Sequence, residues 1–147
     1  MAAATTSPRF EEVEPGTELP PLEVPLTRTL IVATAIASRD YQDVHHDPDL
    51  AVQRGSKDIF MNILTTNGFV GRFVTDWAGP DAVLKKLSIR LGAPNYPGDT
   101  MRLTGTVTGK DSSDATVTIA IRGANGLGDH VTGTVVVALP ERAGARP

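Results

Sequence analysis

Asp40 and His45 are the two residues whose types and spacing point most directly to chemistry in this sequence. They lie five positions apart within the polar stretch 39–49. A carboxylate and an imidazole on one short loop can hold a water molecule between them, and together form an acid/base pair for adding water to, or removing it from, an activated double bond. Because 17 of the 147 residues are acidic, the spacing also arises by chance. A loop histidine bonded to a carboxylate for purely structural reasons stays an alternative.

The other polar residues near this pair favour structural roles. His46 would point away from the pair on an extended loop, which favours a surface or structural role. Asp47 resembles a helix N-cap, because Pro48 follows it at a position suited to the first helical residue. The acidic residues and histidines of 43–49 lack the ligand spacing of zinc helices or calcium loops, so we expect no metal site. His130 is interpreted as structural or partner-facing.

Composition excludes several classes of protein to which this chain could belong. The formal charge is −3 and no basic run is present, which excludes the electrostatic pattern of a nucleic-acid binder. The absence of cysteine excludes disulfides, thiolate metal sites and a cysteine nucleophile. The N-terminal residues lack a signal-peptide pattern, and no apolar run approaches the length of a membrane span. We therefore expect a soluble cytoplasmic protein of one domain, without a membrane partner.

The elements that must position the pair are predicted from the spacing of apolar residues. Residues 29–37 predict a strand that leads the chain to Asp40. A short helix follows, which begins at Pro48 and runs through Leu50 to about Arg54. Apolar residues then recur at helical spacing from Phe60 to Trp77, which predicts one long helix.

The remainder of the chain alternates between apolar and polar residues. This alternation predicts four strands, at residues 87–91, 101–107, 117–121 and 131–139. One strand, a long helix and then an antiparallel sheet indicate an α+β architecture in which the sheet wraps the helix. The proline-rich residues 1–25 are expected to form a flexible or draped N-terminal arm, residues 26–139 the folded domain, and residues 140–147 an irregular C-terminal tail.

Two local motifs resemble the MaoC-like enoyl-CoA hydratases. The first is Asp40-x4-His45-His46-Asp47-Pro48, and the second is the strand and turn Arg90-Leu91-Gly92-Ala93-Pro94-Asn95-Tyr96-Pro97-Gly98-Asp99-Thr100. Both occur in the family's order and flank the predicted long helix. The resemblance implies a single hot-dog fold, with an antiparallel sheet wrapped around one central helix, and the hydration of 2-enoyl-CoA thioesters.

The resemblance is closer to the small subunit of the heteromeric hydratases that act on steroid CoA thioesters with a shortened side chain. The stretches that carry it are 39–47, 55–60, 75–80 and 127–130. The resemblance implies that Asp40 and His45 are catalytic and that a larger MaoC-like subunit is an obligate partner. The expected assembly is a heterotetramer, with docking to a thiolase-like aldolase as a further expectation. No cofactor is implied, because CoA is part of the substrate.

The sequence departs from the family pattern at two places. Gln42 and Asp43 stand where common members have Asn-Pro, and Met61-Asn62 stands where they have His-Gly. The family uses the backbone N–H of that glycine as a donor to the thioester oxygen. Because a backbone donor survives a change of side chain, Asn62 is the expected oxyanion and substrate-binding residue.

Two other functions stay open. Hot-dog proteins also hydrolyse acyl-CoA, so a thioesterase is one alternative. A non-catalytic acyl-binding or scaffold subunit with a vestigial pair is the other. A long helix wrapped by one small sheet leaves little room for a fused-ring substrate, which favours a partner that completes the site.

Overall fold

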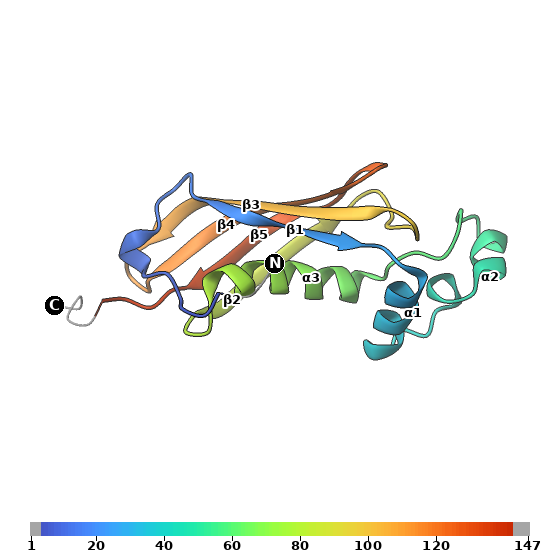
Figure 1. The fold of residues 1–147 in the computed structure, drawn as a ribbon, viewed down its shortest axis with the longest axis horizontal. Coiled ribbons are helices and arrows are strands. Elements are labelled where there is room, and N and C mark those ends of the chain that lie inside the picture. The colour runs from blue at the N-terminus through green and yellow to red at the C-terminus, as the bar shows by residue number, and fades with distance from the viewer. Residues whose placement is uncertain (1–3, 143–147) are drawn as a thin grey trace.

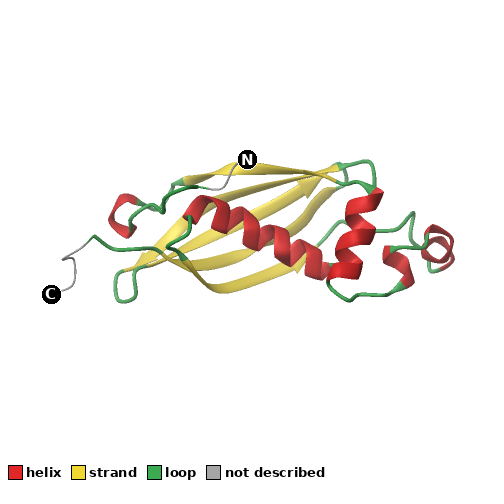
Figure 2. Ribbon diagram, turned by 60° about the horizontal axis from the view of Figure 1, so that its bottom comes forward, coloured by secondary structure: helices red, strands yellow, loops and turns green. Residues whose placement is uncertain are grey.

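The computed structural model describes residues 4–142, and its main feature is an antiparallel sheet with a long helix along one face (Figures 1 and 2). Within these residues the sheet has five strands in the order β1-β3-β4-β5-β2, and every neighbouring pair is antiparallel. The strands are β1 (Glu18–Pro25), β2 (Val83–Leu91), β3 (Thr100–Asp111), β4 (Thr116–Asn125) and β5 (Gly128–Ala138). The predicted α+β architecture, with a sheet around one helix, is confirmed.

The long helix α3 (Ile63–Ala78) forms the core together with the sheet. Its apolar face, which includes Phe73 and Val74, is fully buried. A side-chain carbon at Gly105 of β3 would lie 2.9 Å from the ring of Phe73, so the missing side chain allows the helix to approach the sheet. The predicted long helix over 60–77 is confirmed, but it begins later because Asn62 is its N-cap.

The predicted flexible arm over residues 1–25 is wrong from Phe10 onward. Strand β1 pairs with β3, and the buried hydrophobic residues of this segment join the core: Phe10, Val13, Leu19, Leu22 and Val24. The prolines that suggested an arm, Pro20 and Pro21, lie where the register with β3 shifts. An edge strand tolerates proline at such an irregularity because no ladder hydrogen bond is lost there.

The predicted strand over residues 29–37 is also wrong, because this segment is helix α1 (Arg28–Ala37). The Thr27 side chain caps it by accepting a hydrogen bond from the N–H of Leu30 at 3.0 Å. The fully buried residues are Ile31 and Ala35, four positions apart, which is the helical period rather than the strand period. Three alanines within the segment favour the helix, against the β-branched residues that suggested a strand.

The predicted short helix and the four predicted strands after the long helix agree with the structure. Helix α2 (Pro48–Gln53) is capped by Asp47, whose side chain accepts from the N–H of Leu50, with Pro48 in the first turn. The four predicted strands after the long helix correspond to β2, β3, β4 and β5. The predicted tail over 140–147 lies outside the described residues beyond Arg142. One further short element, the 3-10 helix η1 (Phe10–Glu12), precedes β1.

Helices α1 and α2 project beyond the end of the sheet, on the side where α3 begins (Figure 1). Between them lies a second 3-10 helix, η2 (Asp43–His45). The bidentate ion pair between Arg28 and Asp58, at 2.9 and 2.6 Å, ties α1 to the loop that leads into α3. The predicted catalytic loop is therefore held at the junction of this projecting segment with the start of the long helix.

Candidate active site

Asp40 leaves the end of α1 through a hydrogen-bonded turn. The N–H of Arg39 donates to the carbonyl of Ile36 and that of Asp40 donates to the carbonyl of Ala35, both at 2.9 Å, which is the Schellman pattern. Arg39 has φ 57°, in the left-handed region that glycine usually occupies at this position. The turn therefore sets the direction in which Asp40 departs from the helix.

His45 is fixed by η2 and by Phe60. Its Nδ1 lies 2.7 Å from the carbonyl oxygen of Phe60, and the two rings pack edge to face with centroids 4.9 Å apart. A carbonyl can only accept, so Nδ1 carries the hydrogen, and in the neutral ring Nε2 is an acceptor. The side chain is 7% exposed, so its position is set by packing as well as by this bond.

The structure brings the two predicted residues together. Oδ2 of Asp40 lies 3.4 Å from Nε2 of His45, and the carboxylate keeps 20% of its side-chain surface exposed. With Nε2 unprotonated, both facing atoms are acceptors, so a water molecule beside them can donate one hydrogen to each. The geometry therefore suits a pair that holds and deprotonates water.

Asn62, the third predicted site residue, contacts Asp40 directly. Its Nδ2 donates to Oδ2 of Asp40 at 3.0 Å and to Oγ of Ser38 at 2.9 Å, while its Oδ1 accepts from Thr65. Among the described residues, none accepts a hydrogen bond from the backbone N–H of Asn62. The predicted backbone donor thus has no acceptor within the described chain, and the side chain has a separate contact that the sequence did not predict.

These contacts control the charge of Asp40. The hydrogen bond from the Asn62 side chain lowers the pKa of the Asp40 carboxyl most, against the opposing effect of partial burial. The backbone N–H of Gln42, 3.3 Å from Oδ1, and the attraction of His45 lower this pKa further. The carboxyl is therefore ionised at neutral pH, which is the form that a general base needs.

The three residues open into one pocket of about 330 Å³. Its lining comes from the loop that carries Asp40 and His45, the N-terminal end of α3, the end of β2 and the start of β5. The residues that line it are Asp40, Gln42, His45, Phe60, Met61, Asn62, Ile63, Leu91, Gly92, Pro94 and His130. The second predicted motif, 90–100, thus contributes to the same pocket as the first.

His130 is buried, with 2% exposure, and also lines the active-site pocket. Its Nδ1 donates to the carbonyl of Ala93 at 2.6 Å, so Nε2 accepts from the hydroxyl of Thr66 at 2.9 Å. Burial lowers the pKa of His130, although the bond to Ala93 opposes this effect. The structural interpretation agrees with these bonds, but its place at the pocket was missed, because no local pattern signals contacts to residues so distant in sequence.

Three other polar residues of the loop lie outside the lining of this pocket. His46 is exposed, Asp47 caps α2, and Asp43 pairs with Arg54 at 2.7 Å. Within residues 4–142, no group of three His, Cys, Asp or Glu side chains is placed to hold a metal ion.

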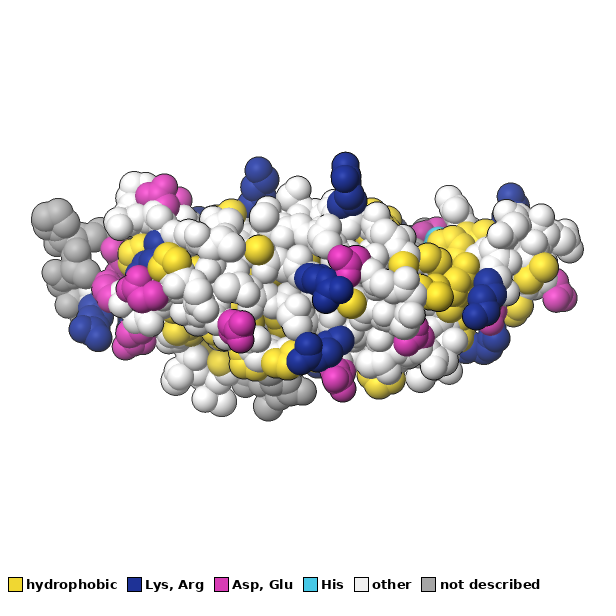
Figure 3. All heavy atoms as spheres, turned by 90° about the horizontal axis from the view of Figure 1, so that it is seen from above, with side chains coloured by type: hydrophobic (Ala, Val, Ile, Leu, Met, Phe, Trp, Pro, Cys, Tyr) yellow, Lys and Arg dark blue, Asp and Glu magenta, His cyan; other side chains and the backbone are white. Residues whose placement is uncertain are grey.

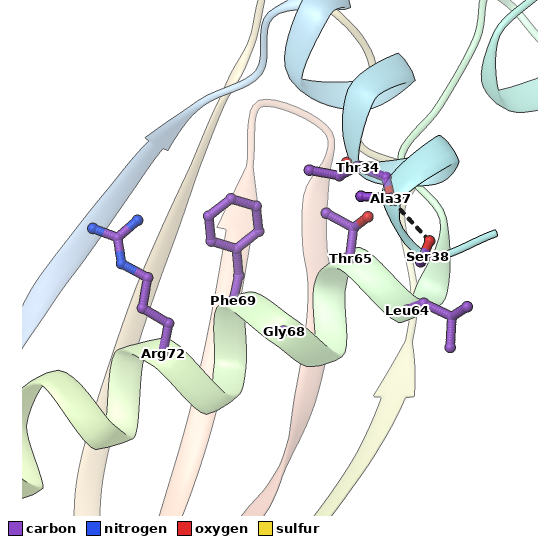
Figure 4. A pocket seen from close by; sticks show the side chains of 8 residues that line it. All are labelled: Thr34, Ala37, Ser38, Leu64, Thr65, Gly68, Phe69 and Arg72. Atoms are coloured by element: carbon purple, nitrogen blue, oxygen red, sulfur yellow. Dashed lines mark hydrogen bonds between the residues drawn. The ribbon is translucent and has the colours of Figure 1, made fainter. Parts of the chain in front are cut away.

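A second, apolar pocket of about 340 Å³ lies between α1 and α3 (Figure 4). Leu64, Phe69 and Arg72 line it from α3, and Thr34, Ala37 and Ser38 from the end of α1. Ser38 and Thr65 line this pocket, and both bond to Asn62, which lines the pocket of Asp40 and His45.

The molecular surface has mixed charge. On the face drawn in Figure 3, basic and acidic side chains are interspersed, and hydrophobic side chains gather at the end that carries the projecting helices. None of the helices in the described part of the chain is long and apolar enough to cross a membrane.

A family model described as "MaoC like domain" matches residues 10–124. The chain is 52% identical over 124 residues to the 3-oxo-4,17-pregnadiene-20-carboxyl-CoA hydratase beta subunit of Mycobacterium tuberculosis (strain ATCC 25618 / H37Rv). The matched residues cover 84% of this chain and 95% of that protein.

Solved structures also match this chain. A chain of the ChsH1-ChsH2 complex from Mycobacterium tuberculosis matches with a TM-score of 0.83 and 52% identity, over 86% of this chain and 98% of that chain. The (R)-hydratase from A. caviae involved in PHA biosynthesis matches with a TM-score of 0.78 and 23% identity, over 88% and 99% of the two chains, and so supports the hot-dog fold alone. The fold is confirmed as a hot dog, and the chain belongs to the MaoC-like domain family.

Proposed function

We propose that this chain hydrates a 2-enoyl-CoA thioester to the 3-hydroxyacyl-CoA. The observation that carries the proposal is the 3.4 Å approach of the Asp40 carboxylate to Nε2 of His45 in a pocket that also contains the start of α3. The family is named for dehydration, and the 52% identical relative is named as a hydratase. An acid/base pair that holds water fits both directions of this reaction.

In this proposal Asp40 takes a proton from the water molecule that it shares with His45. The resulting hydroxyl adds to the β-carbon, and the electrons of the double bond move toward the thioester carbonyl. A proton is then returned to the α-carbon, so the net change is the addition of one water. Asp40 suits the role of base because it is ionised, and His45 orients the water through Nε2.

Negative charge develops on the thioester oxygen during this addition and requires a donor. The backbone N–H of Asn62 has no acceptor among the described residues and lies at the N-terminal end of α3, where the helix dipole favours negative charge. We assign this N–H to the thioester oxygen. It acts where charge appears in the transition state, which is where a donor accelerates the reaction most.

The proposed substrate is a steroid CoA thioester, by analogy with the name of the relative from Mycobacterium tuberculosis. The active-site pocket, at about 330 Å³, lies at the small end of the range of about 300–1,000 Å³ typical of ligand sites. A fused-ring acyl group with CoA needs more space, which supports a larger MaoC-like partner that completes the site. The heterotetramer and its docking to a thiolase-like aldolase stay predictions.

The test is the replacement Asp40→Asn, assayed in the complex with the co-purified larger MaoC-like partner. We expect the loss of enoyl-CoA absorbance to slow by a factor of about 10² to 10⁴, while the variant keeps its fold by circular dichroism. His45→Ala should also lose activity, and His46→Ala, at the adjacent exposed histidine, should keep it. Undiminished turnover by Asp40→Asn would refute the proposal, and release of free CoA, measured with a thiol reagent, would indicate a thioesterase.

A further inference from the structure

Asn62 is a buried N-cap whose side chain does more than begin a helix. The residue is 2% exposed, and both ends of its amide are fully bonded. Oδ1 accepts from the backbone N–H of Thr65 at 3.1 Å and from its hydroxyl at 2.5 Å. Nδ2 donates its two hydrogens to Ser38 and Asp40, at 2.9 and 3.0 Å. An ordinary N-cap needs only the first of these four bonds.

The orientation of the amide follows from its partners. The N–H of Thr65 can only donate, so the amide oxygen must face α3 and the NH₂ group must face α1. Ser38 gives its hydroxyl hydrogen to the carbonyls at the end of α1, with Thr34 at 2.8 Å, and so is free to accept from Asn62. The NH₂ group is therefore fixed on one side by Ser38 and on the other by Asp40.

These contacts fix the orientation of the Asp40 carboxylate. Oδ2 is held by Asn62 and Oδ1 by the N–H of Gln42, so rotation of the carboxylate would break both bonds. Oδ2 is also the atom 3.4 Å from Nε2 of His45. Asn62 thus holds the oxygen that shares the water molecule with the histidine.

We propose that the Asn62 side chain is a positioning group that fixes the Asp40 carboxylate for proton abstraction, while the backbone N–H of the same residue meets the thioester oxygen. The inference rests on the proposed hydratase function. Because Asn62 carries both the side chain that holds Asp40 and the backbone N–H donor, the base and the donor keep a fixed position relative to each other. This pairing comes from the Asn62 side chain, which replaces the glycine that the resemblance led us to expect here.

The groups around the Asp40 carboxylate determine what a change in its titration reports. The titratable group that faces the Asp40 carboxylate is His45, from η2, and His130 lines the same pocket from β5. The other groups bonded to the carboxylate, the amide of Asn62 and the N–H of Gln42, are neutral. A change in the titration of Asp40 on substitution of Asn62 therefore reports the loss of this contact.

Two substitutions separate positioning from helix capping. Asn62→Gly keeps the backbone N–H and removes the amide, and Asn62→Asp keeps an acceptor for Thr65 but turns an oxygen toward Asp40. In both variants we expect kcat of the full complex to fall about tenfold or more, with KM within about twofold. We also expect the acid limb of the kcat/KM profile to move to higher pH, more strongly for Asn62→Asp, where two carboxylates share the site.

The control is Asp47→Gly, which removes the N-cap of α2 and lies outside the pocket. If Asn62 only capped α3, its variants would resemble this control, with lower thermal stability but unchanged kcat and acid limb, and the proposal would be wrong. Thermal melting of both Asn62 variants identifies any loss of fold, which the isosteric Asn62→Asp is designed to avoid.

A second readout does not depend on the enzymatic assay. Titration of ¹³C-labelled aspartate in the full chain, with the Asp40 signal assigned by its loss in Asp40→Asn, should show a higher midpoint in Asn62→Gly than in the wild type. An unchanged midpoint overturns the contact itself. A higher midpoint in Asn62→Gly, found together with a wild-type complex that fails to hydrate enoyl-CoA, supports the contact and refutes the proposed function, so the two failures are distinguishable.

Discussion

Replacement of His130 by glutamine should change both the stability of the protein and its dependence on pH. The ring is buried at the wall of the active-site pocket, between the carbonyl of Ala93 at 2.6 Å and the hydroxyl of Thr66 at 2.9 Å. The bond to Ala93 needs a hydrogen on Nδ1, and the bond from the Thr66 hydroxyl needs an unprotonated Nε2, so the two bonds together fit the neutral ring. Protonation would add a second donor at Nε2 and place a charge in a buried site.

The magnitude follows from these two bonds and from the proton balance. Each buried hydrogen bond contributes about 0.5–1.5 kcal/mol net, so we expect His130→Gln to lower the free energy of unfolding by about 1–3 kcal/mol near pH 7.5. Burial lowers the pKa of His130 below its ordinary value of 6.5. Below pH 6.5 the unfolded chain binds a proton that the folded chain does not, so stability falls as pH falls. For one proton the limiting slope is about 1.4 kcal/mol per pH unit.

The assay is urea unfolding of the wild type and the variant from roughly pH 5 to pH 8, the range in which histidine titrates. The difference in stability between them should be largest above pH 6.5 and should shrink on acidification. Asp40, Asp43 and Asp58 have pKa values lowered from 3.8, so their contributions are lost only as pH falls below that value, outside this range. The exposed His46, replaced by glutamine, is the matched control for the loss of a histidine that is not buried.

A difference in stability that stays constant between pH 5 and pH 8 would refute the argument that His130 is held neutral by burial. A difference that grows on acidification would show the opposite sign, a folded state that favours the protonated ring. Either result would also change the expected role of Thr66, because a protonated ring donates to its hydroxyl rather than accepting from it.

Two further predictions concern the elements that carry the site. Asp47→Ala should lower the free energy of unfolding by about 1 kcal/mol, measured in urea, because the N–H of Leu50 loses its cap; no loss would show that solvent replaces this cap. Phe73→Ala should lower it by about 3–5 kcal/mol, and the same change at Phe69, which is only partly buried on the same helix, should cost clearly less; equal losses would contradict the assignment of Phe73 to the core.

Periodic parts of the sequence predicted the fold well. The long helix has a continuous apolar face, and the four strands after it alternate strictly enough for the sheet to be predicted. Strand β1 was missed because Pro20 and Pro21 suggested an extended arm, and composition does not show that a proline lies at an irregular part of an edge strand. That information comes from the pairing with β3, which is far away in sequence.

The candidate site was predictable only where it is local. Asp40 and His45 lie on one loop, so their pairing could be proposed from spacing and from the motif that contains them. The contact between Asn62 and Asp40 spans 22 residues, and that between His130 and Thr66 spans 64. Neither has a local signature, although an asparagine three residues before Thr65 is a recognisable helix start.

The error at residues 29–37 concerns the part of the site that matters most for Asp40. A strand would have delivered Asp40 with its neighbours on alternate faces, whereas α1 ends in a Schellman turn that reverses the chain through Arg39 at φ 57°. Glycine usually marks such a turn in a sequence, so the turn cannot be recognised where arginine occupies its left-handed position. The left-handed conformation of a residue with a side chain costs about 1–2 kcal/mol, so the contacts on either side must hold it. The Asn62 side chain bonds to Ser38, before the turn, and to Asp40, after it, so these two bonds are placed to hold the turn. The conformation of the turn and the orientation of the proposed base therefore depend on the same two bonds.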